Sequence, residues 1–218
     1  MNKRILPILL GFIALLTVFS AVFAHQPFFE DADFTFEAPW RIADVSVSTA
    51  VYATLDRSSD IDYYVFSANQ DQTIQIEMTI PQVVGLEAFA PTMALIGPGL
   101  PEANLPEAVK IADGHGAIII EPTDATEFYE PFGGQYYWDR QEDRIPAPET
   151  ADYFVAVWHE DGEIGRYVFV AGAREIPGGD PAYRSKIEAY WTLPEPIEEE
   201  DSVGHGSRCY WSGYPGGG

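Results

Sequence analysis

Two stretches of alternating residues constrain the fold of this chain more than any other feature of its sequence. From Ile74 to Ile80 every second residue is apolar and the residues between them are polar, and the segment 45–53 alternates in the same way. Successive side chains of a strand point to opposite faces, so each stretch predicts a strand with one buried face. The residues expected to point inward, here and in later strands, are Val47, Val51, Ile74, Ile76, Met78, Val155, Val157 and Phe169.

Short strands between clusters of Gly, Pro and Asp are expected along the rest of the segment 45–172. The turn Asp161-Gly162-Glu163 predicts a hairpin between the last two of them. No helical pattern is interleaved with the strands, so the sequence predicts an all-β fold, an antiparallel, jelly-roll-like β-sandwich. The further strands are expected at 62–67, 92–96, 117–121, 153–158 and 167–171.

Composition divides the chain into four parts. Residues 1–24 form an export segment, and residues 25–44 form an extension rich in Phe, Asp, Glu and Pro that is expected to pack on the domain. Residues 45–193 form the β-sandwich domain. Residues 194–218 are acidic and then Gly-rich, a composition that predicts a flexible tail.

The sandwich domain is expected to carry two long loops and one short helix. The loops are 97–106 and 131–148, which are long for connections between strands. An amphipathic pattern at 182–191 predicts the helix near the C-terminal end of the domain.

The N-terminus has the features of a cleaved signal peptide. Lys3 and Arg4 precede an uncharged apolar run, which ends in the small residues that a signal peptidase requires. Cleavage after Ala24 would place the protein in the periplasm or outside the cell, with His25 as its first residue. The alternative is an uncleaved anchor, since the run is nearly long enough to cross a bilayer. Only that alternative would bring the protein to a membrane.

The charge of the chain limits the classes of partner that it can bind, and its cysteine content limits how the fold can be stabilised. The chain has 34 acidic and 12 basic residues, for a net charge of −22. Such a field repels nucleic acid and favours cations, basic partners or simple solubility. Cys209 is the only cysteine, so no disulfide can form within the chain.

One segment resembles a known family. Residues 60–66 read Asp-Ile-Asp-Tyr-Tyr-Val-Phe and are followed by a polar turn and the alternating strand. This part of the segment 53–80 resembles the opening of bacterial pre-peptidase C-terminal domains, and residues 153–170 resemble their closing hairpin. The resemblance implies a jelly-roll-like sandwich that accompanies secreted enzymes and helps to bind polymers or partners, sometimes with calcium.

Three histidines suggest a copper site. After cleavage His25 would offer an amine and an imidazole nitrogen, and one more imidazole would complete a set of nitrogen ligands that suits Cu(II). His159, which follows an expected strand, is the first candidate for that ligand, and His115 is the second. The arrangement is similar to the histidine brace of lytic polysaccharide monooxygenases and CopC-like copper carriers. The alternative is that cleavage exposes a histidine by coincidence.

Three aspartates suggest a calcium site. Asp56, Asp60 and Asp62 gather at the entry to an expected strand, and hard cations require several oxygen ligands around one point. The alternative is a solvated turn whose aspartates accept hydrogen bonds from local backbone amides.

The loop 131–148 and the residues just before it suggest a binding surface. Amphipathic aromatic side chains there can form a platform for sugar rings or for a protein. The alternative is that they close over the edge of the sandwich. The residues concerned are Tyr129, Phe132, Tyr136, Tyr137 and Trp138.

These features favour an exported, non-enzymatic binding module that recognises a protein or polysaccharide partner. No hydrolase or metalloprotease motif is present in the sequence. A periplasmic copper-binding protein that uses His25 is the alternative, and a copper-dependent oxidase is a more remote one. No cofactor is implied beyond copper or calcium.

Overall fold

The computed structural model describes residues 25–197 of the chain. The predicted export segment 1–24, its predicted cleavage site and the part of the predicted tail from residue 198 onward lie outside the described residues. No helix among the described residues has the length and apolar character needed to cross a membrane.

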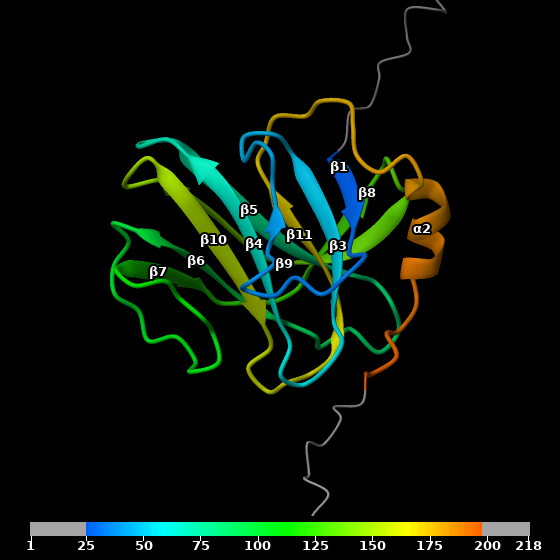
Figure 1. The fold of residues 1–218 in the computed structure, drawn as a ribbon. Coiled ribbons are helices and arrows are strands. Elements are labelled where there is room, and N and C mark those ends of the chain that lie inside the picture. Colours follow the sequence, from blue (N-terminus) through cyan, green and yellow to red (C-terminus); the bar gives the residue numbers. More distant parts are fainter. Residues whose placement is uncertain (1–24, 198–218) are drawn as a thin grey trace, which may run out of the picture.

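The described residues fold into two β-sheets that pack face to face (Figure 1). The six-stranded sheet has the order β1-β3-β11-β5-β9-β8, and the five-stranded sheet has the order β2-β4-β10-β6-β7. The strands are β1 (Gln26–Phe29), β2 (Trp40–Arg41), β3 (Thr49–Leu55), β4 (Ile61–Ala68), β5 (Thr73–Pro81), β6 (Thr92–Pro98), β7 (His115–Ile120), β8 (Thr126–Glu130), β9 (Gln135–Pro146), β10 (Ala151–Trp158) and β11 (Gly165–Ala171). The predicted β-sandwich is therefore confirmed.

The alternating residues fill the space between the sheets. All eight residues expected to point inward are buried. Ile74, Ile76 and Met78 on β5 pack with Val155 and Val157 on β10, so the main core lies between strands of opposite sheets. Burial of these side chains from water is the dominant favourable contribution to the stability of the fold.

The helix α2 (Tyr183–Tyr190) packs on the outer face of the six-stranded sheet (Figure 1). Tyr183, Ile187 and Tyr190 are its buried residues, one turn apart along one side, and they contact residues of β3 and β11. The predicted short C-terminal helix is therefore confirmed.

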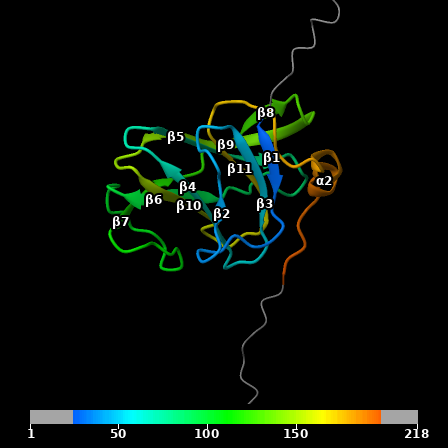
Figure 2. The same ribbon diagram turned by 45° about the horizontal axis from the view of Figure 1, so that its top comes forward.

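The extension 25–44 contributes strands to both sheets. β1 pairs with β3 and β2 pairs with β4, and both pairs are parallel, whereas the other strand pairs of the two sheets are antiparallel. The segment 30–39, which we call the strap, carries the chain from the edge of one sheet to the edge of the other (Figure 2). Parallel pairing of residues so distant from each other leaves no local sequence signal.

The expectation of a long loop at 131–148 is wrong, because most of it is the strand β9, which forms a hairpin with β8. β9 also pairs with β5, and the register shifts where Met78 pairs with Gln141 and Thr79 pairs with Asp139. Arg140 is the extra residue at this bulge, and it interrupts the alternation of β9.

The hairpin expected around Asp161-Gly162-Glu163 is also wrong. β10 belongs to the five-stranded sheet and β11 to the six-stranded sheet, so the turn carries the chain from one layer of the sandwich to the other. Gly162 has a φ of 66° in this turn, which favours glycine. A tight turn between two strands does not by itself show whether they share a sheet.

Candidate metal centre and binding surface

Asp62 is a buried carboxylate at a core-facing position of β4. It lies on the same side of the strand as Tyr64 and Phe66, and all three are fully buried. Its Oδ2 accepts a 2.6 Å hydrogen bond from the hydroxyl of Tyr167 on β11. Its Oδ1 is buried and has no hydrogen-bond partner among the described residues. A buried carboxylate oxygen without a partner is costly, so this atom is the first indication of a site.

The strap brings Glu30 to the same place. β1 ends at Phe29, and the backbone N–H of Glu30 donates to the carbonyl of Tyr52, which keeps the chain beside β3. Oε2 of Glu30 accepts a 2.9 Å hydrogen bond from the backbone N–H of Thr54. The side chain is thus held in one orientation, along the inside of the strap.

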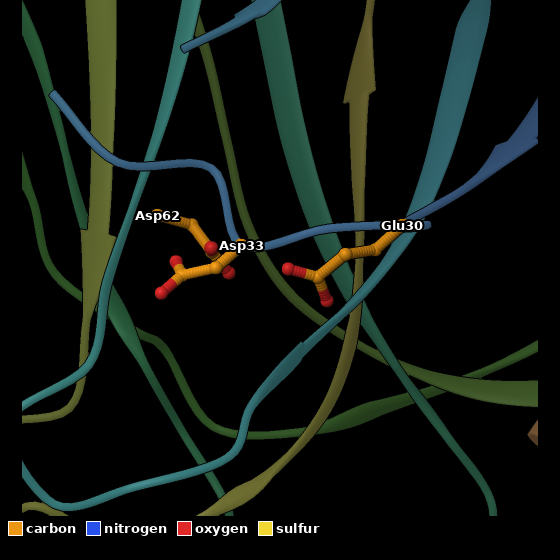
Figure 3. Close-up of side chains that lie close together, drawn as sticks. All are labelled: Glu30, Asp33 and Asp62. Carbon is orange, nitrogen blue, oxygen red and sulfur yellow. The ribbon is translucent and has the colours of Figure 1, made fainter. Parts of the chain in front are cut away.

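Asp33 completes the group, and Figure 3 shows its carboxylate next to that of Asp62, with Glu30 pointing toward both. One ligand oxygen from each of the three side chains lies within 4.8 Å of the other two. Oδ2 of Asp33 accepts a 2.7 Å hydrogen bond from Arg57. We call Glu30, Asp33 and Asp62 the carboxylate cluster.

Glu30 and Asp62 hold their protons more tightly than ordinary carboxylates do. Burial raises the pKa of Glu30 to about 8, and the charges of Asp60 and Asp33 act in the same direction. Burial, followed by the charge of Glu30, raises the pKa of Asp62 well above its usual range. Burial also raises the pKa of the adjacent Asp60 to about 6. Positive charge at this point would relieve the repulsion and compensate for the loss of solvent.

The donor set fits a hard divalent cation. Three carboxylates from two separate segments lie around one point, and one of them, Asp62, has a buried oxygen without a hydrogen-bond partner among the described residues. Calcium binds six to eight oxygen atoms in flexible geometry, and backbone carbonyls and water complete the set in many proteins. Imidazole and thiolate ligands, which softer metals prefer, are absent from the cluster.

Only one of the three aspartates expected to bind calcium belongs to the cluster. Asp62 does, whereas Oδ2 of Asp60 accepts a 2.8 Å hydrogen bond from the backbone N–H of Asp56. Oδ1 of Asp56 in turn accepts a 2.9 Å hydrogen bond from Arg57. Asp56 and Asp60 therefore order the turn before β4, and both lie next to the cluster.

Glu30 and Asp33 are not among the ligands that the sequence predicts. A signal was present, because Glu30 follows Phe29 and Asp33 precedes Phe34. Phe34 is buried in the core, and its carbonyl accepts a 2.6 Å hydrogen bond from the backbone N–H of Tyr63. Carboxylates next to such aromatic anchors have to lie close to the domain.

The three candidate copper ligands lie in separate places. His25 is beside the start of β3, where its Nδ1 contacts the hydroxyl of Ser48. His159 stacks on Phe89 near the other end of β3, with ring centroids 5.3 Å apart. The seven residues of β3 separate these two ends by roughly 20 Å. His115 is on β7, at the far edge of the five-stranded sheet.

The turn after β10 already uses His159. Its Nδ1 accepts hydrogen bonds from the backbone N–H groups of Asp161 and Glu163, at 3.3 and 3.2 Å. For His25, burial lowers the pKa of the imidazole. The structure thus brings none of the three histidines next to another.

The aromatic residues expected to bind a partner divide into two groups. Tyr137 is buried under α2, and Trp138 packs against the main core. Tyr129, Phe132 and Tyr136 on the β8–β9 hairpin are 48%, 45% and 48% exposed. We call these three residues the aromatic tip.

The turn that carries the aromatic tip is ordered by Glu130. Its two carboxylate oxygens accept hydrogen bonds from the backbone N–H groups of Phe132 and Gly133, at 2.6 and 2.5 Å. Phe132 stacks on Tyr183 of α2, with ring centroids 5.6 Å apart. The tip is therefore held in place before any partner arrives, which lowers the entropy cost of binding.

Comparisons with known proteins find similar folds at low identity. No family model and no curated protein matches the sequence. One similar solved structure is the pre-peptidase C-terminal domain of a Bacillus anthracis collagenase, at 11% identity and a TM-score of 0.36, with 64% of this chain and 97% of that chain covered. This domain is of the family that the segment 53–80 resembles.

Two other solved structures are similar at comparable levels. Aeromonas hydrophila PliG, a periplasmic lysozyme inhibitor of g-type lysozyme, has 12% identity and a TM-score of 0.33, with 68% of this chain and 98% of that chain covered. CorA, a surface-associated copper-binding protein of Methylomicrobium album BG8, has 9% identity and a TM-score of 0.30, with 69% and 99% covered.

Proposed function

We propose that this chain is an exported β-sandwich binding module whose strap is fastened to the sandwich by a calcium ion. Glu30 and Asp33 of the strap and Asp62 of β4 would bind the ion. Two observations carry the proposal: Oδ1 of Asp62 is buried and has no hydrogen-bond partner among the described residues, and one carboxylate oxygen of Asp62 lies within 4.8 Å of ligand oxygens of Glu30 and Asp33. The module would recognise a protein partner with its aromatic tip.

Calcium would act as a structural fastener. Two of the three ligands belong to the strap, so the ion would join the N-terminal strands to the body of the domain. Arg57 pairs with Asp33 and Asp56 at the rim, at 2.7 and 2.9 Å, rather than with the buried Asp62. The cation would supply the positive charge that the inner part of the cluster needs.

Thermal unfolding of the chain from His25 to Gly218, with and without calcium, tests the calcium site. A ligand that binds only the folded state stabilises it by about 2.7 kcal/mol at a hundred times its dissociation constant. Calcium should therefore raise the melting temperature by several degrees, and magnesium at the same concentration should raise it less.

Asp62→Asn is the decisive variant for the calcium site. Asparagine keeps the size of the side chain, removes the buried charge and weakens cation binding, so the variant should fold and lose the response to calcium. Asp113→Asn, in the exposed loop before β7, is the matched control and should keep that response. If calcium raised the melting temperatures of the two variants equally, the proposal would be contradicted. General screening of the net negative charge would then explain the rise.

The aromatic tip supports a protein partner rather than a sugar ligand. Tyr129 and Tyr136 lie side by side with their ring planes inclined by 48°, so they do not form a flat platform for a sugar ring. Exposed aromatic side chains on an ordered scaffold are typical anchors of protein interfaces. The large net negative charge favours a partner with a basic rim.

Photo-crosslinking in the native host tests the surface. A benzophenone side chain at position 136 should give one discrete adduct with a protein, and the same group at the exposed position 102 should not. Identical adducts at the two positions would rule out the aromatic tip as the specific surface. Loss of the adduct on addition of a soluble polysaccharide would assign the tip to a sugar ligand instead.

A further inference from the structure

We propose that a cavity between the two N-terminal strands binds a small organic anion with an aromatic body, such as an aromatic carboxylate. The cavity has a volume of about 430 Å³ and is lined by residues of β1 and β2 and of the segments that follow β2 and β11. It is separate from the carboxylate cluster and from the aromatic tip, neither of which contributes a lining residue.

The cavity exists because two edge strands fail to close the sandwich. β1 is the edge of the six-stranded sheet and β2 is the edge of the five-stranded sheet. They belong to different sheets, so no backbone ladder joins them. The rest of the wall comes from the segments around Val47 and Ile176, which are held together by the parallel bridge between Val47 and Arg174.

The interior of the cavity is apolar and partly aromatic. Phe28 and Trp40 face each other from the two strands, with ring centroids 5.3 Å apart. Both side chains are partly exposed, and Trp40 packs at the edge of the main core. Val47 and Ile176 add aliphatic surface. Such walls suit the apolar body of a ligand, and the volume lies in the range of small-molecule sites.

Two arginines give the cavity its preference for an anion. Arg41 and Arg174 both line it, together with one acidic residue, Asp44, although acidic residues greatly outnumber basic ones in the chain as a whole. Each is paired at 3.0 Å with an aspartate, Arg41 with Asp152 and Arg174 with Asp44. These pairs are half-exposed to solvent, and exposed ion pairs are weak.

A ligand carboxylate can therefore exchange for the aspartates. Arginine binds a carboxylate through two parallel hydrogen bonds, and such bonds become stronger next to apolar walls that exclude water. An uncharged ligand of the same shape would gain only the apolar contacts. The arrangement thus predicts selectivity for an anionic aromatic ligand over a neutral one.

Fluorescence titration of the chain from His25 to Gly218 with 1-anilinonaphthalene-8-sulfonate tests this proposal. The probe should bind saturably, with one molecule per chain, and 4-phenylbutyrate should displace it. The neutral analogue N-phenyl-1-naphthylamine has the same rings without the sulfonate and should bind at least about tenfold more weakly, since it makes no charge-assisted hydrogen bonds.

Four variants locate the site. Arg174→Gln and Arg41→Gln should each weaken binding of the anionic probe about tenfold. Asp44→Asn should strengthen it, because that change releases Arg174 from its ion pair. Ala43→Trp places a large ring at an exposed position of the lining and should abolish binding without unfolding the chain.

Arg184→Gln, on the exposed face of α2, removes the same charge elsewhere and is the control, which should bind like the unchanged chain. Equal affinity of the anionic probe for the unchanged chain and both cavity arginine variants would overturn the proposal. Equal binding of the neutral analogue would overturn it as well. Saturable binding that survives Ala43→Trp would place the ligand elsewhere, with the same consequence.

Discussion

The hydroxyl of Tyr167 donates a 2.6 Å hydrogen bond to Oδ2 of Asp62, and both side chains are completely buried. The same hydroxyl lies 2.8 Å from that of Tyr64, so three buried polar groups form one chain. This network fixes the carboxylate of Asp62, whose other oxygen is buried without a hydrogen-bond partner among the described residues, and Asp62 is a member of the carboxylate cluster. The core of the sandwich thus orients a ligand of the proposed calcium site.

Tyr167→Phe should destabilise the domain. The change removes the hydrogen bond to Asp62 and leaves a second buried carboxylate oxygen without a partner, at a cost of about 2–3 kcal/mol. The loss should be smaller in calcium, since the cation would hold the same carboxylate. Urea unfolding with calcium and with a chelator measures both values. If the loss of unfolding free energy were the same with and without calcium, the hydrogen bond from Tyr167 would have no role in the calcium site.

Glu77→Gln should change the pH dependence of stability. Burial, with the charges of Asp139 and Glu142, raises the pKa of Glu77 to about 7, and Arg144 opposes the shift. The folded state therefore holds this proton more tightly than the unfolded state, whose ordinary pKa is 4.5. The stability from Glu77 is fully present below pH 4.5 and is lost as the pH rises through 7.

Melting temperatures from pH 4 to pH 8, measured in a chelator, test this expectation. Toward pH 8 the melting temperature of the Glu77→Gln variant should rise by a few degrees relative to that of the unchanged chain, because glutamine resembles the protonated acid. Glu102→Gln, at an exposed loop position, should follow the unchanged chain throughout. A gap that does not vary with pH would contradict the shifted pKa.

Gly97→Ala should destabilise the sandwich by about 2 kcal/mol or more through overpacking. A methyl group at this position of β6 would overlap the ring of Tyr153, which is fully buried. Gly114 serves as the control position, because a methyl group there would meet no other atom within 4 Å. Only the backbone φ of 77° disfavours alanine at that position. Gly114→Ala should cost about 1 kcal/mol. Denaturant unfolding ranks the two, and equal losses would argue against the clash.

Tyr190→Phe should weaken the attachment of α2 to the six-stranded sheet. The hydroxyl of Tyr190 lies 2.7 Å from the carbonyl oxygen of Ala53 and 2.5 Å from that of Tyr167, and it is buried. Loss of its hydrogen bond should cost about 1–2 kcal/mol. Tyr129→Phe, at the exposed aromatic tip, should be nearly neutral. Hydrogen exchange of α2 should rise in the first variant only, and unchanged protection would show that packing alone holds the helix.

The parts of the fold that the sequence predicts are those governed by local periodicity. Ile74, Ile76 and Met78 indicate their buried face because adjacent side chains alternate across a strand. β1 and β2 give no such signal, because a parallel partner far along the chain determines their pairing. β9 is obscured by the bulge at Arg140, which breaks the alternation.

In the candidate site, too, the sequence predicts what local patterns determine and misses what long-range contacts determine. Asp62 belongs to a recognisable strand motif and is predicted as a ligand from sequence. Glu30 and Asp33 join it only because Phe34 anchors the strap in the core, a long-range contact. Tyr137 is buried because α2 packs on its face of β9, and Trp138 packs against the main core, whereas Tyr136 stays exposed. The sequence of the hairpin alone does not specify where α2 packs.

Anomalous diffraction from crystals grown in calcium tests the central claim most directly. One calcium ion is expected within the 2.3–2.6 Å bonding range of Oδ1 of Asp62, with oxygens of Glu30 and Asp33 among its other ligands. A protonated cluster without an ion in saturating calcium would contradict the account. So would a calcium ion bound elsewhere on the chain with Asp62 still unligated.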